Sequence, residues 1–134
     1  MPCTAEFRDD QGLVLSGFGV VTGNELIDVN RSLVCDRIKS LRYVIVDLTP
    51  ATELHVATLD IRAIVEEDRR LAALAPRRLP VAIATSSNLG FGLARMWETF
   101  VGDVTEWQTA LFRSRKEAES WVQVMTERSS CGRE

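Results

Sequence analysis

The single histidine of the chain, His55, lies in a polar stretch between two acidic residues, Asp47 and Asp60. A histidine held by a carboxylate beside a hydroxyl group can act as a general base, so this set would suit a small hydrolase or transferase. No serine or cysteine has an identifiable base beside it in the sequence. A single histidine in a polar loop is more typical of an ordinary surface residue than of a catalyst. Catalysis is therefore the alternative hypothesis.

A second polar group, Ser86-Ser87-Asn88, directly precedes the segment Gly90-Phe91-Gly92, with Arg95 about one turn farther on. Hydroxyl groups and the first N–H groups of a helix can together hold a phosphate or a carboxylate. The segment does not match the dinucleotide fingerprint, because Arg95 occupies the position of its third glycine. A tight turn and close packing of the helix on the sheet also explain the glycines. An anion site and a purely structural role both stay open, and we expect no cofactor.

Phe91 falls on the opposite side of its expected helix from the apolar stripe, near Arg95 and Glu98. An exposed aromatic ring at a helix start can face a ligand or another subunit. The Leu54-His55 loop can equally cover it. The sequence leaves both interpretations open.

The three cysteines, Cys3, Cys35 and Cys131, are odd in number and far apart, with no Cys-x-x-Cys pair and no histidines at metal-ligand spacing. This pattern excludes a disulfide scaffold and a zinc site. The helical spacing of the neighbouring apolar residues places Cys35 on the outer side of the chain.

The composition also excludes several classes of partner. The chain has 134 residues, 46% of them hydrophobic, which is enough for one domain with a real core. The formal net charge of -3 gives no electrostatic footprint for nucleic acid. Residues 1–10 lack the apolar region of a signal peptide, and no run is long enough to span a membrane. We therefore expect a cytoplasmic protein that does not bind nucleic acid.

Residue patterns predict the strands that must position these groups. Two extended segments, Thr4–Arg8 and Leu13–Val21, flank a polar stretch ending in glycine and are expected to pair antiparallel. The runs Tyr43–Leu48 and Leu79–Thr85 are continuously apolar, which is typical of parallel strands buried on both faces. A last strand is expected near Trp107–Phe112.

Four helices are expected between and after these strands. Capping boxes at Thr22–Glu25 and Ser114–Glu117 open the first and last of them. The other two span about Thr58–Leu74, with Thr58 as its cap, and about Leu89–Val101. Asp68 falls within the apolar stripe of the second helix, so either it is a partly buried carboxylate with a partner or the helix is rotated from this assignment.

The order of elements predicts a single α/β domain over residues 1–126. Its expected sheet is mixed and mostly parallel, with about five strands and four main helices around it. Residues 127–134 are expected to form a flexible tail. Ligands of open α/β sheets bind outside the carboxyl ends of the strands. The candidate ligand-binding residues at this rim are Asp47, Thr49, Thr58, Ser86, Ser87, Asn88, Phe91 and Arg95.

Four stretches share an order and separation that span roughly residues 12 to 122. They are Gly19–Thr22 followed by Glu25, Asp47–Thr49, Gly90–Met96 and Phe112–Trp121. Together they resemble the SpoIIAA-like group of STAS and SEC14-type domains. The resemblance implies a mixed-sheet α/β domain related to bacterial anti-sigma-factor antagonists.

In those antagonists, a serine at a helix start, within an Asp-Ser-Ser-Gly-type motif, is phosphorylated by a partner kinase. The equivalent region here, Glu53–Asp60, has no such motif, so that role cannot be carried over. Thr58 is the nearest hydroxyl; a structural cap is favoured there over a phosphorylation switch. The leading hypothesis is a non-enzymatic binding or regulatory module. It would engage a protein partner or a small anionic or lipid-like ligand at the rim, and a homodimer is compatible with it.

Overall fold

Two neighbouring parallel strands form the centre of the fold. We describe a computed structural model that covers residues 3–33 and 35–132. β4 (Tyr43–Asp47) and β6 (Pro80–Ala84) pair in parallel, with Val44 opposite Val81 and Asp47 opposite Ala84. Nearly all their residues are buried, as their continuous apolar runs predict. The two strands therefore deliver their carboxyl ends to one edge of the sheet.

Three further strands complete the main sheet, which has the order β1-β2-β4-β6-β7. β1 (Cys3–Phe7) pairs antiparallel with β2 (Gly12–Gly17), which confirms the predicted opening hairpin. β2 and β7 (Gln108–Phe112) are parallel to their inner neighbours. The predicted fold class, a mixed and mostly parallel five-stranded sheet with four main helices, is confirmed.

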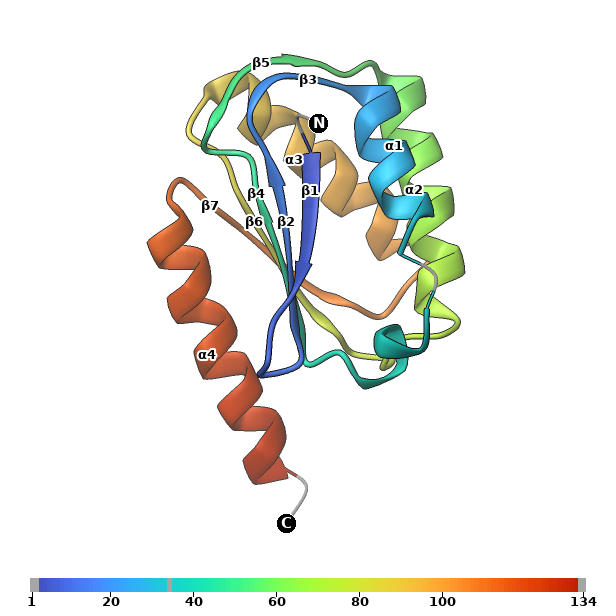
Figure 1. Ribbon diagram of the computed structural model, residues 1–134, viewed down its shortest axis with the longest axis vertical. Helices are drawn as coiled ribbons and strands as arrows, with labels where there is room; N and C mark the ends of the chain where they lie inside the picture. The colour runs from blue at the N-terminus through green and yellow to red at the C-terminus, as the bar shows by residue number, and fades with distance from the viewer. Residues whose placement is uncertain (1–2, 34, 133–134) are drawn as a thin grey trace.

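The helices form two unequal layers on the sheet (Figure 1). α1 (Gly23–Arg31), α2 (Thr58–Ala72) and α3 (Asn88–Gly102) cover one face, and α4 (Arg115–Gly132) alone covers the other. A short 3-10 helix, η1 (Asp36–Ser40), follows α1. The larger core lies under α1–α3, and a smaller one under α4 joins β4 and β6 to Ala118 and Val122.

The capping box predicted at Thr22–Glu25 is complete, and the one predicted at Ser114–Glu117 is present in its hydroxyl half. Thr22 Oγ1 accepts a hydrogen bond from Glu25 N at 3.3 Å, and Glu25 Oε1 accepts one from Thr22 N at 2.9 Å. Ser114 Oγ accepts from Glu117 N at 3.2 Å. These contacts satisfy N–H groups that a helix start leaves without partners.

The predicted strand Leu13–Val21 is instead two strands. Gly19 has a φ of 67°, a left-handed conformation that glycine adopts at little cost, and it turns the chain out of the main sheet. The next residues form β3 (Gly19–Thr22) in a second, two-stranded sheet. Its partner is β5 (Ala51–His55), which corrects the prediction that His55 lies in a polar loop. The β3–β5 ribbon crosses the upper end of the main sheet (Figure 1).

The start of α2 also differs from the prediction. Ala57, not Thr58, is the N-cap, and the Asp60 carboxylate accepts a hydrogen bond from Ala57 N at 2.8 Å. Asp60 also packs against Gly23, where an added Cβ would collide with its carboxyl group. An aspartate at the third helical position therefore replaces the expected threonine cap.

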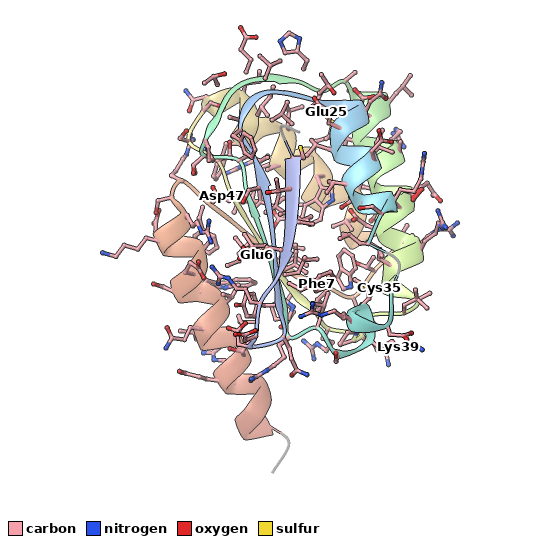
Figure 2. All side chains as sticks on the ribbon, in the orientation of Figure 1. Glu6, Phe7, Glu25, Cys35, Lys39 and Asp47 are labelled. Carbon is pink, nitrogen blue, oxygen red and sulfur yellow. The ribbon has the colours of Figure 1, made fainter. Side chains whose placement is uncertain are left out.

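The remaining differences concern the ends of helices. The helical spacing of the apolar residues Leu26, Val29, Leu33, Val34 and Ile38 predicts a longer first helix, but α1 ends at Arg31. The buried Leu33 and Ile38 therefore lie beyond it, and Val34 lies outside the described residues. Cys35 is exposed, as predicted (Figure 2). α4 continues to Gly132, through most of the range predicted to be a tail.

Candidate functional site

Asp47, the first predicted rim residue, ends β4 on the face covered by α4 (Figure 2). It is only 4% exposed. Its Oδ1 accepts hydrogen bonds from Thr49 N at 3.0 Å and from Thr49 Oγ1 at 2.6 Å, and its Oδ2 lies 3.5 Å from an Arg115 nitrogen. Asp47 and Thr49 thus close the turn after β4 and tie it to the start of α4.

The polar residues after β6 form a separate group at the start of α3. Ser87 Oγ is the N-cap and accepts from Gly90 N at 2.9 Å. Arg113 donates to the Ser86 carbonyl at 3.3 Å and to Asn88 Oδ1 at 3.1 Å. Arg113, which the sequence did not single out, therefore joins the end of β7 to the start of α3.

Phe91 is half-buried, and two guanidinium groups lie near its ring. The Arg113 Cζ atom is 4.2 Å from its ring centroid and the Arg95 Cζ atom is 5.4 Å away, distances typical of cation–π contacts. Phe91 and Arg95 line a shallow surface hollow together with Glu98, Thr99 and Leu111. The roles of these residues in ligand binding stay predictions.

The residues of the catalytic alternative are engaged separately. His55 Nε2 lies 3.1 Å from Glu53 Oε2 on the exposed β5 strand. Asp60 accepts from Ala57 N, and Asp47 is held by Thr49 and Arg115. Thr58 is exposed in the first turn of α2. Within the described residues, this geometry gives no support to a histidine–carboxylate–hydroxyl site.

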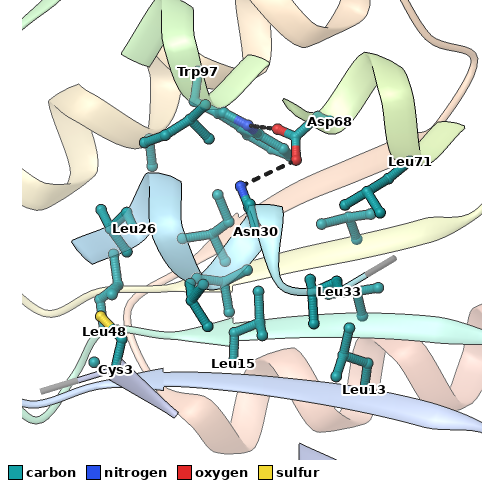
Figure 3. A pocket seen from close by; sticks show the side chains of 18 of the residues that line it. Cys3, Leu13, Leu15, Leu26, Asn30, Leu33, Leu48, Asp68, Leu71 and Trp97 are labelled. Carbon is teal, nitrogen blue, oxygen red and sulfur yellow. Dashed lines mark hydrogen bonds between the residues drawn. The ribbon is translucent and has the colours of Figure 1, made fainter. Parts of the chain in front are cut away.

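A cavity of about 120 Å³ lies between the sheet and helices α1–α3 (Figure 3). Its wall is almost entirely apolar. One end lies below the β3–β5 ribbon and the other near the end of α2. Residues that line these two ends include Cys3, Leu48 and Leu54 at the first and Leu71, Leu79 and Trp107 at the second. The sequence did not predict this cavity.

One charged residue, Asp68 of α2, lines the cavity on its helical side (Figure 3). It is 5% exposed. Its Oδ2 accepts a hydrogen bond from Trp97 Nε1 of α3 at 2.7 Å, and its Oδ1 accepts one from Asn30 Nδ2 of α1 at 3.3 Å. Asp68 thus links the three helices that cover this face. Of the two interpretations that the sequence left open, the buried carboxylate with partners is the correct one.

The surroundings of Asp68 favour its neutral form. Burial, partly opposed by the hydrogen bond from Trp97 and reinforced by the nearby Glu67 carboxylate, raises the pKa of the Asp68 carboxyl to about 7. Glu67 itself pairs with Arg31 at 3.4 Å and with Arg70 at 3.0 Å. The two arginines therefore neutralise the neighbouring carboxylate, while Asn30 and Trp97, which donate to Asp68, are uncharged.

Two other polar features belong to the same wall. Burial raises the pKa of the Cys3 thiol, so the sulfur at the ribbon end of the cavity is neutral. The Trp107 Nε1 atom is buried and has no hydrogen-bond partner among the described residues.

The described part of the chain holds no cluster of three or more histidine, cysteine or acidic residues able to bind a metal. None of its helices is long and apolar enough to cross a bilayer.

Comparisons with known proteins address the fold. No family model matches the chain, and no curated protein matches it. The chain is similar to a solved structure from Shewanella loihica PV-4, described as an uncharacterized protein from the DUF3478 family with a SpoIIAA-like fold. The two share 17% sequence identity and a TM-score of 0.49, over 90% of this chain and 91% of that chain. The description of that structure names the SpoIIAA-like fold that the sequence resemblance implies.

Proposed function

We propose that this chain is a non-enzymatic binding module whose site is the cavity between the sheet and helices α1–α3. Its ligand is a small, mainly apolar molecule, in keeping with the lipid-like class that the sequence suggested. The observation that carries the proposal is the volume of about 120 Å³ lined by an almost entirely apolar wall. The ligand would therefore bind beneath the rim, not on it.

The energetics of an apolar cavity support this proposal. A cavity in a core costs about 24 cal/mol per Å³, so about 120 Å³ corresponds to roughly 3 kcal/mol. An apolar molecule that fills the space recovers part of this by restoring contacts, and a cavity of about 150 Å³ is known to stay dry and to bind benzene. The volume here therefore suits a ligand of about that size or slightly smaller.

A thermal-shift screen with small hydrocarbons, short alcohols and amines tests the proposal. A ligand that binds only the folded chain at ten times its Kd adds about 1.4 kcal/mol of stability, which is roughly a 5 °C rise in Tm for a domain of this size. We expect such a rise for at least one apolar compound. Phosphorylated metabolites, added as a comparison, should have no effect through this cavity.

Ala94 offers a way to fill the space from within. Its side chain is 5% exposed and lines the cavity from α3. Ala94→Leu should abolish the ligand-induced rise in Tm, and Val81→Ile, which adds a single carbon from β6, should weaken it. Ala73→Leu, at the exposed end of α2, is the matched control and should respond as the wild type does. Equal responses in Ala94→Leu and Ala73→Leu would place the ligand elsewhere and overturn the proposal.

A further inference from the structure

We infer that the molecule bound in the cavity is a small apolar amine whose ammonium group is held by the Asp68 carboxylate. This inference rests on the proposed function and adds the chemical class of the ligand to it. It concerns one acidic side chain in the helical wall of the cavity and the charges around that side chain.

The hydrogen bonds of Asp68 leave acceptor capacity toward the cavity. Each carboxylate oxygen accepts one bond, from Asn30 Nδ2 at 3.3 Å and from Trp97 Nε1 at 2.7 Å. An ionised carboxylate offers about four lone-pair sites, so roughly two stay open to a donor. Since Asp68 lines the cavity, a molecule inside it can supply that donor.

A cation is the partner that the surroundings do not supply. On α1 and α3 the groups that contact Asp68 are the neutral side chains of Asn30 and Trp97. On α2 the adjacent Glu67 is acidic, and it holds Arg31 and Arg70, whose side chains are each 61% exposed. The strands facing the cavity contribute apolar residues together with Cys3 and Ser16. A buried carboxylate is costly when unpaired, so a ligand ammonium contributes more here than a hydroxyl group does.

The shape of the cavity selects the apolar part of the ligand. The lining residues extend from Cys3 and Leu48 at one end to Leu33 and Leu71 at the other, with Asp68 on the helical side (Figure 3). A volume of about 120 Å³ holds a short alkyl chain of roughly five carbons and excludes long-chain amphiphiles. A short primary alkylamine fits both requirements.

Binding of an amine must depend on pH, because the ion pair requires ionised Asp68. With a pKa of about 7, Asp68 is roughly one-tenth ionised at pH 6 and nine-tenths ionised at pH 8. The apparent affinity scales with the competent fraction, so it should increase roughly tenfold between these values. Binding near pH 7 should also release protons. The affinity of an uncharged ligand of the same length should not increase with pH in this way.

Three probes with the same number of non-hydrogen atoms test the inference: n-pentylamine, 1-pentanol and n-hexane, each titrated by calorimetry at pH 6 and pH 8. We expect n-pentylamine to bind at least tenfold more tightly than 1-pentanol at pH 8. This advantage should disappear in Asp68→Asn and persist in Glu66→Gln, a change of an exposed acid on the same helix. Hexane should bind both variants equally.

The outcomes separate the two proposals. Binding of hexane and pentanol that Ala94→Leu blocks would support the cavity proposal. The amine inference is overturned if pentylamine then binds no more tightly than pentanol, or if its tighter binding persists in Asp68→Asn. If none of the three probes binds, both proposals are overturned. Calorimetric titration of the wild type with n-pentylamine in two buffers of different ionisation enthalpy measures proton release without using any variant. Absence of proton release there would also contradict the inference.

Discussion

Replacing Asp68 by asparagine should change how the stability of the free protein depends on pH. The substitution keeps the size of the side chain and removes its charge. Its oxygen can still accept from Trp97 Nε1, and its amide can donate to Asn30 if the Asn30 amide is turned over, so neither partner is left unsatisfied. Asp68→Asn therefore imitates the neutral acid.

The magnitude follows from the pKa of Asp68, which burial raises from 3.8 to about 7. The folded protein then binds more protons than the unfolded chain between these values, so stability from this group is fully present below pH 3.8 and is lost as pH rises to about 7. This direction is opposite to that of an ion-paired aspartate. At 1.36 kcal/mol per pKa unit, about three units correspond to roughly 4 kcal/mol.

Urea denaturation of both proteins from pH 4 to pH 8 measures this effect directly. We expect equal stability, within about 1 kcal/mol, near pH 4, and a variant more stable by roughly 2–4 kcal/mol at pH 8. The pH dependence of groups that do not interact with Asp68 cancels in the difference. Glu66→Gln, which removes an exposed acid paired with Arg69 at 3.2 Å, should change stability by less than about 0.5 kcal/mol at all pH values.

A difference that stays constant across this range would refute the reasoning. It would mean that Asp68 has the same pKa in the folded and unfolded chain, which its burial and its uncharged partners do not allow. A variant that is less stable at every pH would instead show that Asn30 and Trp97 cannot adapt to the amide. In that case the hydrogen-bond account would be wrong as well.

Three further predictions concern other parts of the fold. Gly90→Ala should lower stability by roughly 1–3 kcal/mol, because its Cβ would collide with Thr85 Oγ1. Gly92→Ala on the same helix, whose Cβ would have nothing within 4 Å, should raise stability by about 0.5–1 kcal/mol, and urea titrations compare the two variants. Arg8 donates two hydrogen bonds, of 2.8 Å and 2.9 Å, to the Glu119 carboxylate of α4. A double-mutant cycle should give a coupling energy of about 1 kcal/mol or more for this pair, and a coupling near zero would contradict the pairing. The hydrogen bond from Arg8 lowers the pKa of Glu119, so the stability that Glu119 contributes is present above pH 4.5 and is lost as pH falls. Glu119→Gln should therefore make the free energy of unfolding less sensitive to acid, as measured at pH 3 to 6.

The central strands and the helix starts could be predicted because their causes are local. A continuous apolar run such as Tyr43–Leu48 requires cover on both faces, and β4 has it. The capping boxes at Thr22 and Ser114 depend on residues three positions apart. The β3–β5 ribbon was missed because its pairing joins segments about thirty residues apart, and the β5 segment lacks the apolar–polar alternation of a half-buried strand.

The cavity could not be predicted, since an enclosed volume depends on how side chains from many elements fail to meet. One signal was present. Asp68 interrupts the apolar stripe of α2, and a charged residue there requires a buried partner. Its partners, Asn30 and Trp97, lie 38 and 29 positions away in the sequence, so only the fold could identify them.

The two faces of the sheet distinguish a binding cavity from general looseness. Under α4, the small side chains of Ala82, Ala84 and Ala118 let helix and strands approach closely, and all three are completely buried. Under α1–α3, larger branched side chains surround the cavity, and one wall carries an acid. A packing defect gains nothing from a buried carboxyl group, which costs stability above its pKa. Filling the cavity through Ala94→Leu would stabilise the protein on either view, so only the loss of ligand response in that variant distinguishes a site from a defect.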